Sequence, residues 1–507
     1  MALLDPSSGE APVAVKKTAI DKDLKRIGQL QKATTHARLG YYEIGLGLLF
    51  VLAVWAYTYL QSGSTEGYAV IAIASIVGAY MAMNIGANDV ANNVGPAVGS
   101  KALTMAGALA IAAVFEAAGA LIAGGEVVTT ISKGIVSPAS FADSSVFIAA
   151  MLAALMAAAL WVNIATVVGA PVSTTHSIVG GVMGGGIAAA GVSAVDWPVM
   201  GTIAASWVIS PVMGGLIAAA FLTFIKFAIV FRQDKVAAAV RWIPVLVGVM
   251  AGAFSVYLAM KGLKNIFKPT PAMLTGLGVA SFAAGYALMR YVGLRNAATI
   301  ENRRKAVGQL FRAPLICAAA LLSFAHGSND VANAVGPLAA IVTAVEGGAI
   351  DAKVTLPFWV LAIGAIGISI GLMLFGPKII RIVGEKITKL DPVRAFCVAL
   401  SASITVIFAS TLGLPVSSTH VAVGGVFGVG FLREFLVNRQ FFLSAQPVDA
   451  SDPSVADDIT INRWAKAKKR KLVRRRHMLG IAAAWVVTVP ASALMAAALF
   501  FVIRAVM

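Results

Sequence analysis

Two short segments place a carboxylate between two amides inside apolar surroundings. They read Gly86-Ala87-Asn88-Asp89-Val90-Ala91-Asn92 and Gly327-Ser328-Asn329-Asp330-Val331-Ala332-Asn333. An ionisable residue in a long apolar run is costly and is expected to be functional. Residues four apart share one face of a helix, so each segment presents its two amides together. Carboxylate and amide oxygens suit a small cation such as Na⁺, and a desolvated Asp could carry a proton instead. Interhelical hydrogen bonding would use the same residue types, but two copies favour a site. We expect Asp89, Asn92, Asp330 and Asn333 to couple a cation, and Asn88 and Asn329 to bind substrate.

A second pair of segments carries hydroxyls after a proline. They read Ala170-Pro171-Val172-Ser173-Thr174-Thr175-His176 and Leu414-Pro415-Val416-Ser417-Ser418-Thr419-His420. Proline favours the first turn of a helix, and the free N–H groups of a helix N-terminus attract anions. Bonding of each hydroxyl to its own helix is the alternative. We expect these hydroxyls and both Asp residues to bind an oxyanion together, without a buried Arg. The hydroxyls are those of Ser173, Thr174, Thr175, Ser417, Ser418 and Thr419.

Four further ionisable residues lie in apolar runs. His176 and His420 close the hydroxyl segments and could relay a proton, bind substrate or donate between helices. Glu116 has no counterpart in the second half, and either cation coupling or structural pairing would explain it. His326 stands before the second Asn-Asp segment where Ile85 stands before the first, so it breaks the repeat and we leave it out of the predicted site. No catalytic constellation and no structural metal site is predicted.

The composition defines an integral membrane protein. Of 507 residues, 59% are hydrophobic and 12% are charged, against about 25% charged in an average soluble domain. Thirteen apolar runs, each near the length of about 20 residues that a membrane helix needs, predict an all-α polytopic fold. The net charge of +17 lies mainly in the segments between these runs, as in the cytoplasmic loops of membrane proteins. We therefore predict no nucleic-acid partner.

Both motifs recur in the same order, which predicts an inverted repeat of two homologous halves. Gly and Pro in each Asn-Asp segment suggest broken helices at the midplane of the bilayer, the usual place of a transporter site. The Pro-Val-Ser segments could instead be re-entrant hairpins. The expected divisions are a basic cytoplasmic tail (1–42), a first half (43–235), connecting helices with a basic loop (236–312), a second half (313–432), a basic insertion (433–477) and a last membrane helix (478–507).

The paired Asn-Asp segments, each followed by Pro-Val-Ser-x-Thr-His, resemble the inorganic phosphate transporter (PiT) family over roughly residues 70–435. The resemblance implies a secondary transporter, not an enzyme, that imports inorganic phosphate by alternating access with Na⁺ or H⁺, or as a metal–phosphate complex. It also implies a multi-pass protein of a bacterial inner membrane with a cytoplasmic N-terminus and no resident cofactor. A sulfate permease of the same fold is the alternative, and a homodimer stays open.

Overall fold

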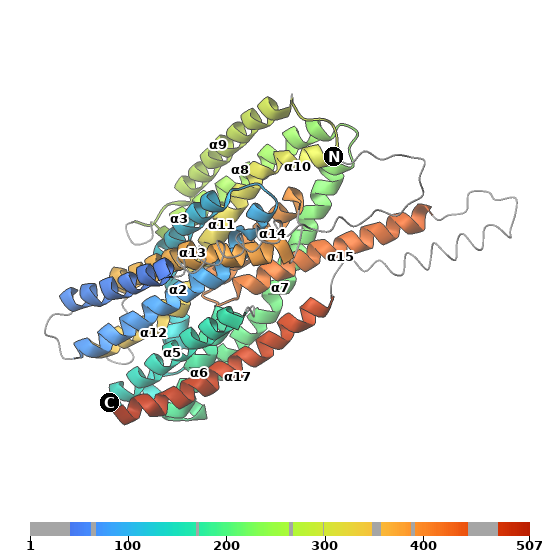
Figure 1. Cartoon of the computed structure of the whole chain (residues 1–507). Helices are drawn as coiled ribbons and strands as arrows, with labels where there is room; N and C mark the ends of the chain where they lie inside the picture. Colours follow the sequence, from blue (N-terminus) through green and yellow to red (C-terminus); the bar gives the residue numbers. More distant parts are fainter. Residues whose placement is uncertain are drawn as a thin grey trace, which may run out of the picture. The chain divides into compact units, whose positions relative to one another are not determined.

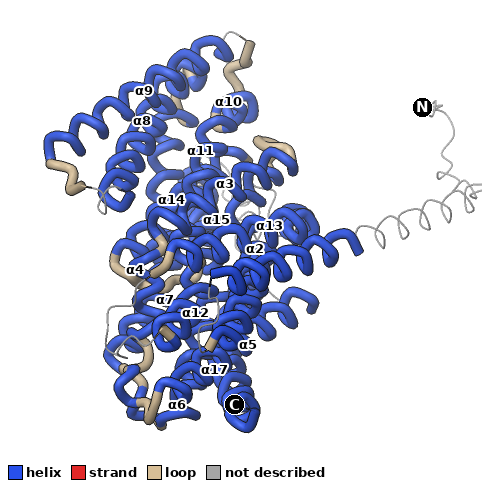
Figure 2. The backbone as a smooth tube through the Cα atoms, turned by 90° about the vertical axis from the view of Figure 1, so that its left-hand side faces the viewer, coloured by secondary structure: helices blue, strands red, loops and turns tan. Residues whose placement is uncertain are grey.

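The computed structural model describes residues 41–61, 67–168, 172–262, 267–297, 299–346, 356–386, 391–444 and 475–506. Residues 1–40 of the predicted N-terminal tail, and the part of the basic insertion from 445 to 474, lie outside these residues. Contacts divide the chain into Met1–Leu49 and Phe50–Met507, and the second unit contains both pairs of motifs. The described residues are nearly all helical and contain no β-strand, only an isolated bridge between Val136 and Val195 (Figure 2).

Eleven helices in the described part of the chain are long and apolar enough to cross a membrane. This confirms an all-α polytopic membrane protein. The other two predicted runs form helices α6 (Thr174–Ala190) and α15 (Ser418–Ser444), which are the Pro-Val-Ser segments. The eleven spans are Tyr41–Gln61, Tyr68–Gly99, Met105–Ala123, Ser144–Thr166, Trp197–Val230, Lys235–Gly262, Pro271–Ala297, Arg312–Val345, Phe358–Lys378, Pro392–Thr411 and Val486–Val506.

The helices fall into three groups along the chain (Figure 1). The first comprises α2 (Tyr68–Gly99), α3 (Met105–Ala123), the short α4 (Gly125–Thr129), α5 (Ser144–Val168), α6 and α7 (Trp197–Ile225). A connecting group follows, with α8 (Lys235–Gly262), α9 (Pro271–Ala297) and α10 (Arg304–Leu310). The last comprises α11 (Arg312–Asp330), α12 (Ala332–Val345), α13 (Phe358–Lys386), α14 (Pro392–Thr411), α15 and α17 (Arg475–Val506).

Several helices begin where the sequence supplies a side-chain cap. Thr104, Ser173, Asp196 and Asp391 each accept a hydrogen bond from the backbone N–H three residues later. Such a bond satisfies one of the free donors at a helix start and is worth about 1 kcal/mol. The cap at Ser173 fixes where α6 begins, directly before the hydroxyls of interest.

The expected break in the first Asn-Asp segment is wrong, because α2 runs unbroken from Tyr68 to Gly99 with Pro96 inside it. Gly86 serves close packing instead: a Cβ there would lie 2.0 Å from the carbonyl oxygen of Ile368. In the second segment a turn at Val331 separates α11 from α12, although its φ of −56° and ψ of −33° remain helical. The clear interruptions lie before α6 and α15, which supports hairpins at the Pro-Val-Ser segments.

The helix of the first Asn-Asp segment runs antiparallel to that of the second. A Cβ on Gly67, at the start of α2, would lie 2.5 Å from Val345 at the end of α12. Further along α2, a Cβ on Gly78 would lie 3.2 Å from Leu338. The residue numbers on α12 fall as those on α2 rise, so the two helices point in opposite directions, as an inverted repeat requires. This arrangement brings the middle of α2 against the end of α11.

Each half packs its helices on the other half through matched glycines. Helix α2 packs on α13 through Gly86 and Ile368, while α11 packs on α3 through Gly327 and Glu116. In both places an added Cβ would lie 2.0 Å from the facing carbonyl oxygen. Small residues allow such close approach of helices in membranes. The two contacts are therefore counterparts in the repeat.

The hairpin helices α6 and α15 pack in the same reciprocal way. Helix α6 packs on α17, and α15 packs on α7. A Cβ on Gly184 would lie 2.2 Å from the carbonyl oxygen of Ala493, and one on Gly428 would lie 2.0 Å from that of Gly215. We infer that α17 is the counterpart of α7, so that the second repeat extends to the last helix. Figures 1 and 2 both place α5, α6 and α17 side by side.

Candidate functional site

Two carboxylates and an imidazole meet in the interior of the protein. Asp89 lies in the middle of α2, and His326 and Asp330 lie one turn apart at the end of α11. One ligand atom from each of the three falls within 4.8 Å of the others, and all three side chains are at most 1% exposed. His326 Nε2 lies 3.1 Å from Asp330 Oδ2 and 3.8 Å from Asp89 Oδ2. Residues far apart in the sequence thus form one buried ionisable cluster.

The hydroxyls of the Pro-Val-Ser segments reach the two carboxylates. Thr174 donates to Asp89 Oδ2 at 3.1 Å, and Thr419 donates to Asp89 Oδ1 at 2.9 Å. Ser418 donates to Asp330 Oδ2 at 3.2 Å. All three hydroxyls stand in the first turn of α6 or α15, so two helix N-termini are directed at the acidic cluster. Helix N-termini stabilise negative charge.

The expected cation-coupling amides connect the two halves. Asn92 Nδ2 donates to Thr419 Oγ1 at 2.7 Å, from the first Asn-Asp segment to the second hydroxyl segment. Asn333 Nδ2 makes the reciprocal contacts, at 3.3 Å to Thr174 and 3.2 Å to Thr175. Each amide uses its N–H₂ group here, so its oxygen stays available to a ligand. The structure therefore brings Asn92 and Asn333 into the cluster.

The two remaining amides, Asn88 and Asn329, bond to the hairpin segments. Asn88 Nδ2 donates to Thr166 at 2.9 Å on α5. Asn329 Nδ2 donates to Ser410 at 2.9 Å and to the carbonyl of Leu414 at 3.1 Å, and its oxygen accepts from the N–H of Val416 at 3.1 Å. In this structure both side chains brace a hairpin. Their role as substrate ligands stays a prediction.

Two of the expected hydroxyls serve as helix caps. Ser173 Oγ accepts from the N–H of His176 at 3.1 Å, and Ser417 Oγ accepts from the N–H of His420 at 3.3 Å. Thr175 donates to the carbonyl of Val416 at 3.1 Å and so links the two hydroxyl segments. The two caps match the local-bonding alternative, whereas the Thr175 contact does not. The caps leave the O–H of both serines to donate elsewhere.

The two motif histidines form a separate aromatic group. The ring centroids of His176 and His420 lie 4.8 Å apart, and Trp207 lies 3.9 Å from His176. Trp207 donates to the carbonyl of Pro415 at 3.1 Å. The rings pack where the two hydroxyl segments meet, and the proton-relay role stays a prediction.

Sequence reasoning missed His326 and underrated Glu116. Glu116 Oε2 lies 3.2 Å from His326 Nδ1, and Asn93 donates to Glu116 Oε1 at 2.8 Å. These contacts form a buried chain from Asn93 through Glu116 and His326 to Asp330. The available signal was the i, i+4 spacing of His326 and Asp330, which places them on one face. The repeat hides this signal, because His326 has no counterpart in the first half.

Unsatisfied acceptors mark what the cluster can hold. Among the described residues in and beside the cluster, four buried carboxylate or amide oxygens have no hydrogen-bond partner: Asp330 Oδ1, Asn333 Oδ1, Asn93 Oδ1 and Glu116 Oε2. A buried acceptor without a donor is costly, and a cation relieves that cost. Hard cations prefer carboxylate and amide oxygens. The donor set of Asp89, Asp330 and the amide oxygens therefore fits a small cation.

A polytopic helical fold with duplicated polar hairpins meeting at a buried charged site defines a membrane transporter rather than an enzyme. The chain belongs to the phosphate transporter family, whose model matches residues 85–496. A "Putative phosphate permease" of Helicobacter pylori strain J99 is 46% identical, over 94% of this chain and 98% of that protein. One of the same name from Thermococcus kodakarensis is 37% identical, over 86% and 98%. Among solved structures, one described as "The sodium-dependent phosphate transporter" aligns with a TM-score of 0.75 and 35% identity, covering 87% of this chain and all of that one.

Proposed function

We propose that this protein is a symporter that imports inorganic phosphate with a coupling cation by alternating access across a bacterial inner membrane. The observation that carries the proposal is the buried pair Asp89 and Asp330, held within 4.8 Å by antiparallel helices of the two repeats. Basic segments at 232–241 and 290–312 favour placing those ends in the cytoplasm.

Coupling follows from electrostatics at this pair. Two like charges about 4 Å apart repel by about 4 kcal/mol at an effective dielectric constant of about 20. A phosphate anion would therefore be rejected by the cluster while Asp89 and Asp330 are ionised and uncompensated. A cation bound between the carboxylates and the phosphate offsets this repulsion and attracts the anion beside it. Cation and phosphate then bind together or not at all, which is the requirement for symport.

Na⁺ is the coupling ion that we propose. The unpartnered oxygens of Asp330 and Asn333 are ligands for a hard cation, and the similar solved structure is that of a sodium-dependent phosphate transporter. Phosphate would be held beside this cation by the N–H groups of two helix starts and by the hydroxyls of Thr174, Ser418 and Thr419, each of which would turn its O–H from the carboxylate to the anion. These are neutral donors, so the anion can leave again.

Alternating access requires movement, because the cluster is closed. Its hydroxyls, carboxylates and imidazole are at most 7% exposed. We propose that the hairpins α5–α6 and α14–α15 open in turn on opposite faces. Each carries one hydroxyl segment, and each is fastened to the opposite repeat by α17 or α7.

Uptake into proteoliposomes tests this function. Purified protein is reconstituted, and ³²P-phosphate uptake is measured with an inward Na⁺ gradient and a pH gradient imposed separately. We expect accumulation with Na⁺ alone, and we expect excess unlabelled phosphate, but not sulfate, to suppress it. Accumulation driven only by the pH gradient would overturn Na⁺ coupling. A requirement for a divalent cation in the same compartment as phosphate would indicate a metal–phosphate substrate instead.

A further inference from the structure

A cavity of about 280 Å³ lies far from the charged cluster, among the ends of four helices of the connecting region. The end of α9 and the starts of α8 and α11 enclose it, together with α10. Figures 1 and 2 both show α8, α9 and α10 grouped together, away from α5, α6 and α17. None of its lining residues belongs to the transport site.

The lining changes from apolar to polar. Val240, Ile243 and Met289 are 4–6% exposed and form the apolar part. Asn296 and Arg312, both exposed, line it as well. The cavity thus offers a guanidinium and an amide next to an apolar floor. A ligand that matches it has an anionic end joined to an apolar body.

The surrounding surface is strongly basic. Arg290 is used by the fold, since it donates to the carbonyl of Val240 at 3.0 Å, and Arg303 pairs with Glu301 at 3.0 Å. No such ion pair involves Arg312 in the described part of the chain. Segments 232–241 and 290–312 contain only two acids, Asp234 and Glu301, against nine basic residues: Arg232, Lys235, Arg241, Arg290, Arg295, Arg303, Arg304, Lys305 and Arg312.

The occupant is therefore a membrane lipid. Next to the cavity, Leu288, Tyr291 and Leu294 of α9 are 54–64% exposed, and in a membrane helix such a surface faces acyl chains. A phosphodiester suits Arg312, because Arg binds phosphate through several fixed donors. Free phosphate would leave the apolar floor uncovered. We propose that this cavity binds the headgroup and upper chains of an anionic phospholipid.

Such a lipid would influence transport through α11. Arg312 starts this helix and Asp330 ends it, a separation of about 27 Å at 1.5 Å per residue. The bound lipid would fasten the peripheral hairpin α8–α9 to the start of the helix that carries His326 and Asp330. Anionic lipid should then raise the uptake rate without being transported.

Native mass spectrometry of the purified full chain from nanodiscs of phosphatidylcholine with phosphatidylglycerol gives the direct test. We expect wild-type protein to retain phosphatidylglycerol, and Arg312→Gln to lower this retention at least fivefold. Gly293→Leu should do the same by filling the cavity, since a Cβ there comes no closer than 3.8 Å to Val240. Two controls on α9, Arg295→Gln and Gly276→Leu, lie outside the lining and should retain the lipid.

Equal loss in Arg312→Gln and Arg295→Gln would overturn the proposal in favour of a diffuse basic surface. Displacement of the lipid by millimolar inorganic phosphate would identify a free-anion site instead. A parallel arm measures uptake in proteoliposomes with and without phosphatidylglycerol. We expect severalfold stimulation in wild type and in Arg295→Gln, and none in Arg312→Gln. Stimulation of Arg312→Gln equal to that of wild type would also contradict the site.

Discussion

The two repeats share a close glycine contact, but the residues beside that contact differ. Gly86 and Gly327 make equivalent contacts, each against a carbonyl of a partner helix. Ile85 precedes Gly86, whereas His326 precedes Gly327. The facing carbonyls belong to Ile368 and Glu116, so these two also hold corresponding positions.

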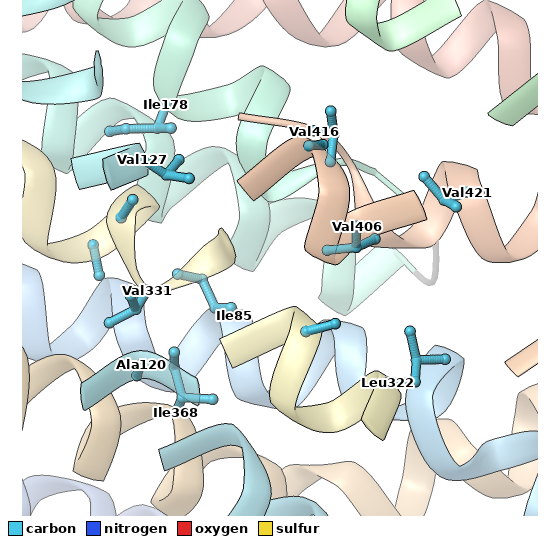
Figure 3. Packing of buried hydrophobic residues seen from close by; sticks show 14 of the residues in the cluster. Ile85, Ala120, Val127, Ile178, Leu322, Val331, Ile368, Val406, Val416 and Val421 are labelled. Atoms are coloured by element: carbon cyan, nitrogen blue, oxygen red, sulfur yellow. The ribbon is translucent and has the colours of Figure 1, made fainter. Parts of the chain in front are cut away.

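An apolar pair at one of these contacts therefore corresponds to an ionisable pair at the other. Ile85 and Ile368 belong to the hydrophobic core, where Figure 3 labels both. Glu116 and His326 are fully buried and lie 3.2 Å apart. The backbone tolerates either pair, so packing alone does not demand the charges. As a result, Asp89 and Asp330 have unlike surroundings, because an imidazole lies directly beside Asp330.

The largest effect should come from removing either carboxylate, the feature that both repeats share. Asp89→Asn and Asp330→Asn keep side-chain volume while removing charge. We expect each to lower Na⁺-driven phosphate uptake by at least a hundredfold, because the cation loses its charged ligand. Uptake is measured at matched reconstitution, with the exposed-loop variant Glu301→Gln as the control. Near-normal uptake in both variants would refute a coupling role.

Replacing Glu116 and His326 by isoleucine, the residue at both corresponding positions, tests whether the ionisable pair serves stability or transport. His326→Ile or Glu116→Ile alone leaves one buried group without its partner, which costs about 3–5 kcal/mol. The double variant reproduces the isoleucine pair of the corresponding contact, so we expect it to recover most of that stability. Unfolding of the purified proteins in denaturant measures this difference.

Transport should not recover with stability in the double variant. If the imidazole beside Asp330 serves coupling, uptake per folded molecule should stay at least tenfold below wild type. Wild-type uptake in a stable double variant would reduce the pair to a structural feature. A double variant no more stable than either single one would show that the two positions are not equivalent.

Hydroxyl removal should give a smaller effect that differs between two positions of the second hydroxyl segment. Thr419 contacts Asp89 and Asn92, whereas Ser417 mainly caps α15. A hydrogen bond to a charged group contributes about 1.5–3 kcal/mol, so Thr419→Ala should raise the apparent KM for phosphate by roughly tenfold or more. The cap variant Ser417→Ala should lower stability by about 1 kcal/mol with less change in KM. The reverse order would assign substrate contact to Ser417.

Much of this site could be predicted from residue types and their repetition. The carboxylates and hydroxyls stand out because polar groups are costly in apolar helices, and their duplication indicates a shared centre. The continuity of α2 could not be predicted, because Gly86 serves a contact with α13 that only the tertiary structure provides. Asn88 and Asn329 look like ligands in sequence, yet their partners lie on the hairpins. His326 and Glu116 escape a search that uses symmetry as the sign of function, because here the departure from symmetry carries the ionisable pair.

The smallest expected effect concerns the two bracing amides, which differ in number of partners. Asn329 makes three hydrogen bonds to the segment around α14 and α15, and Asn88 makes one, to Thr166. At about 1 kcal/mol for each bond, Asn329→Ala should lower the free energy of unfolding by about 3 kcal/mol and Asn88→Ala by about 1 kcal/mol. Because the hydrogen bonds of both side chains go to the hairpins, both variants should keep the apparent KM for phosphate within a factor of two of wild type, at matched amounts of folded protein. Denaturant unfolding and uptake kinetics on the same preparations check both statements. A large rise in KM without loss of stability would return Asn88 and Asn329 to the substrate site, and it would mean that the hairpins reposition these amides when phosphate binds.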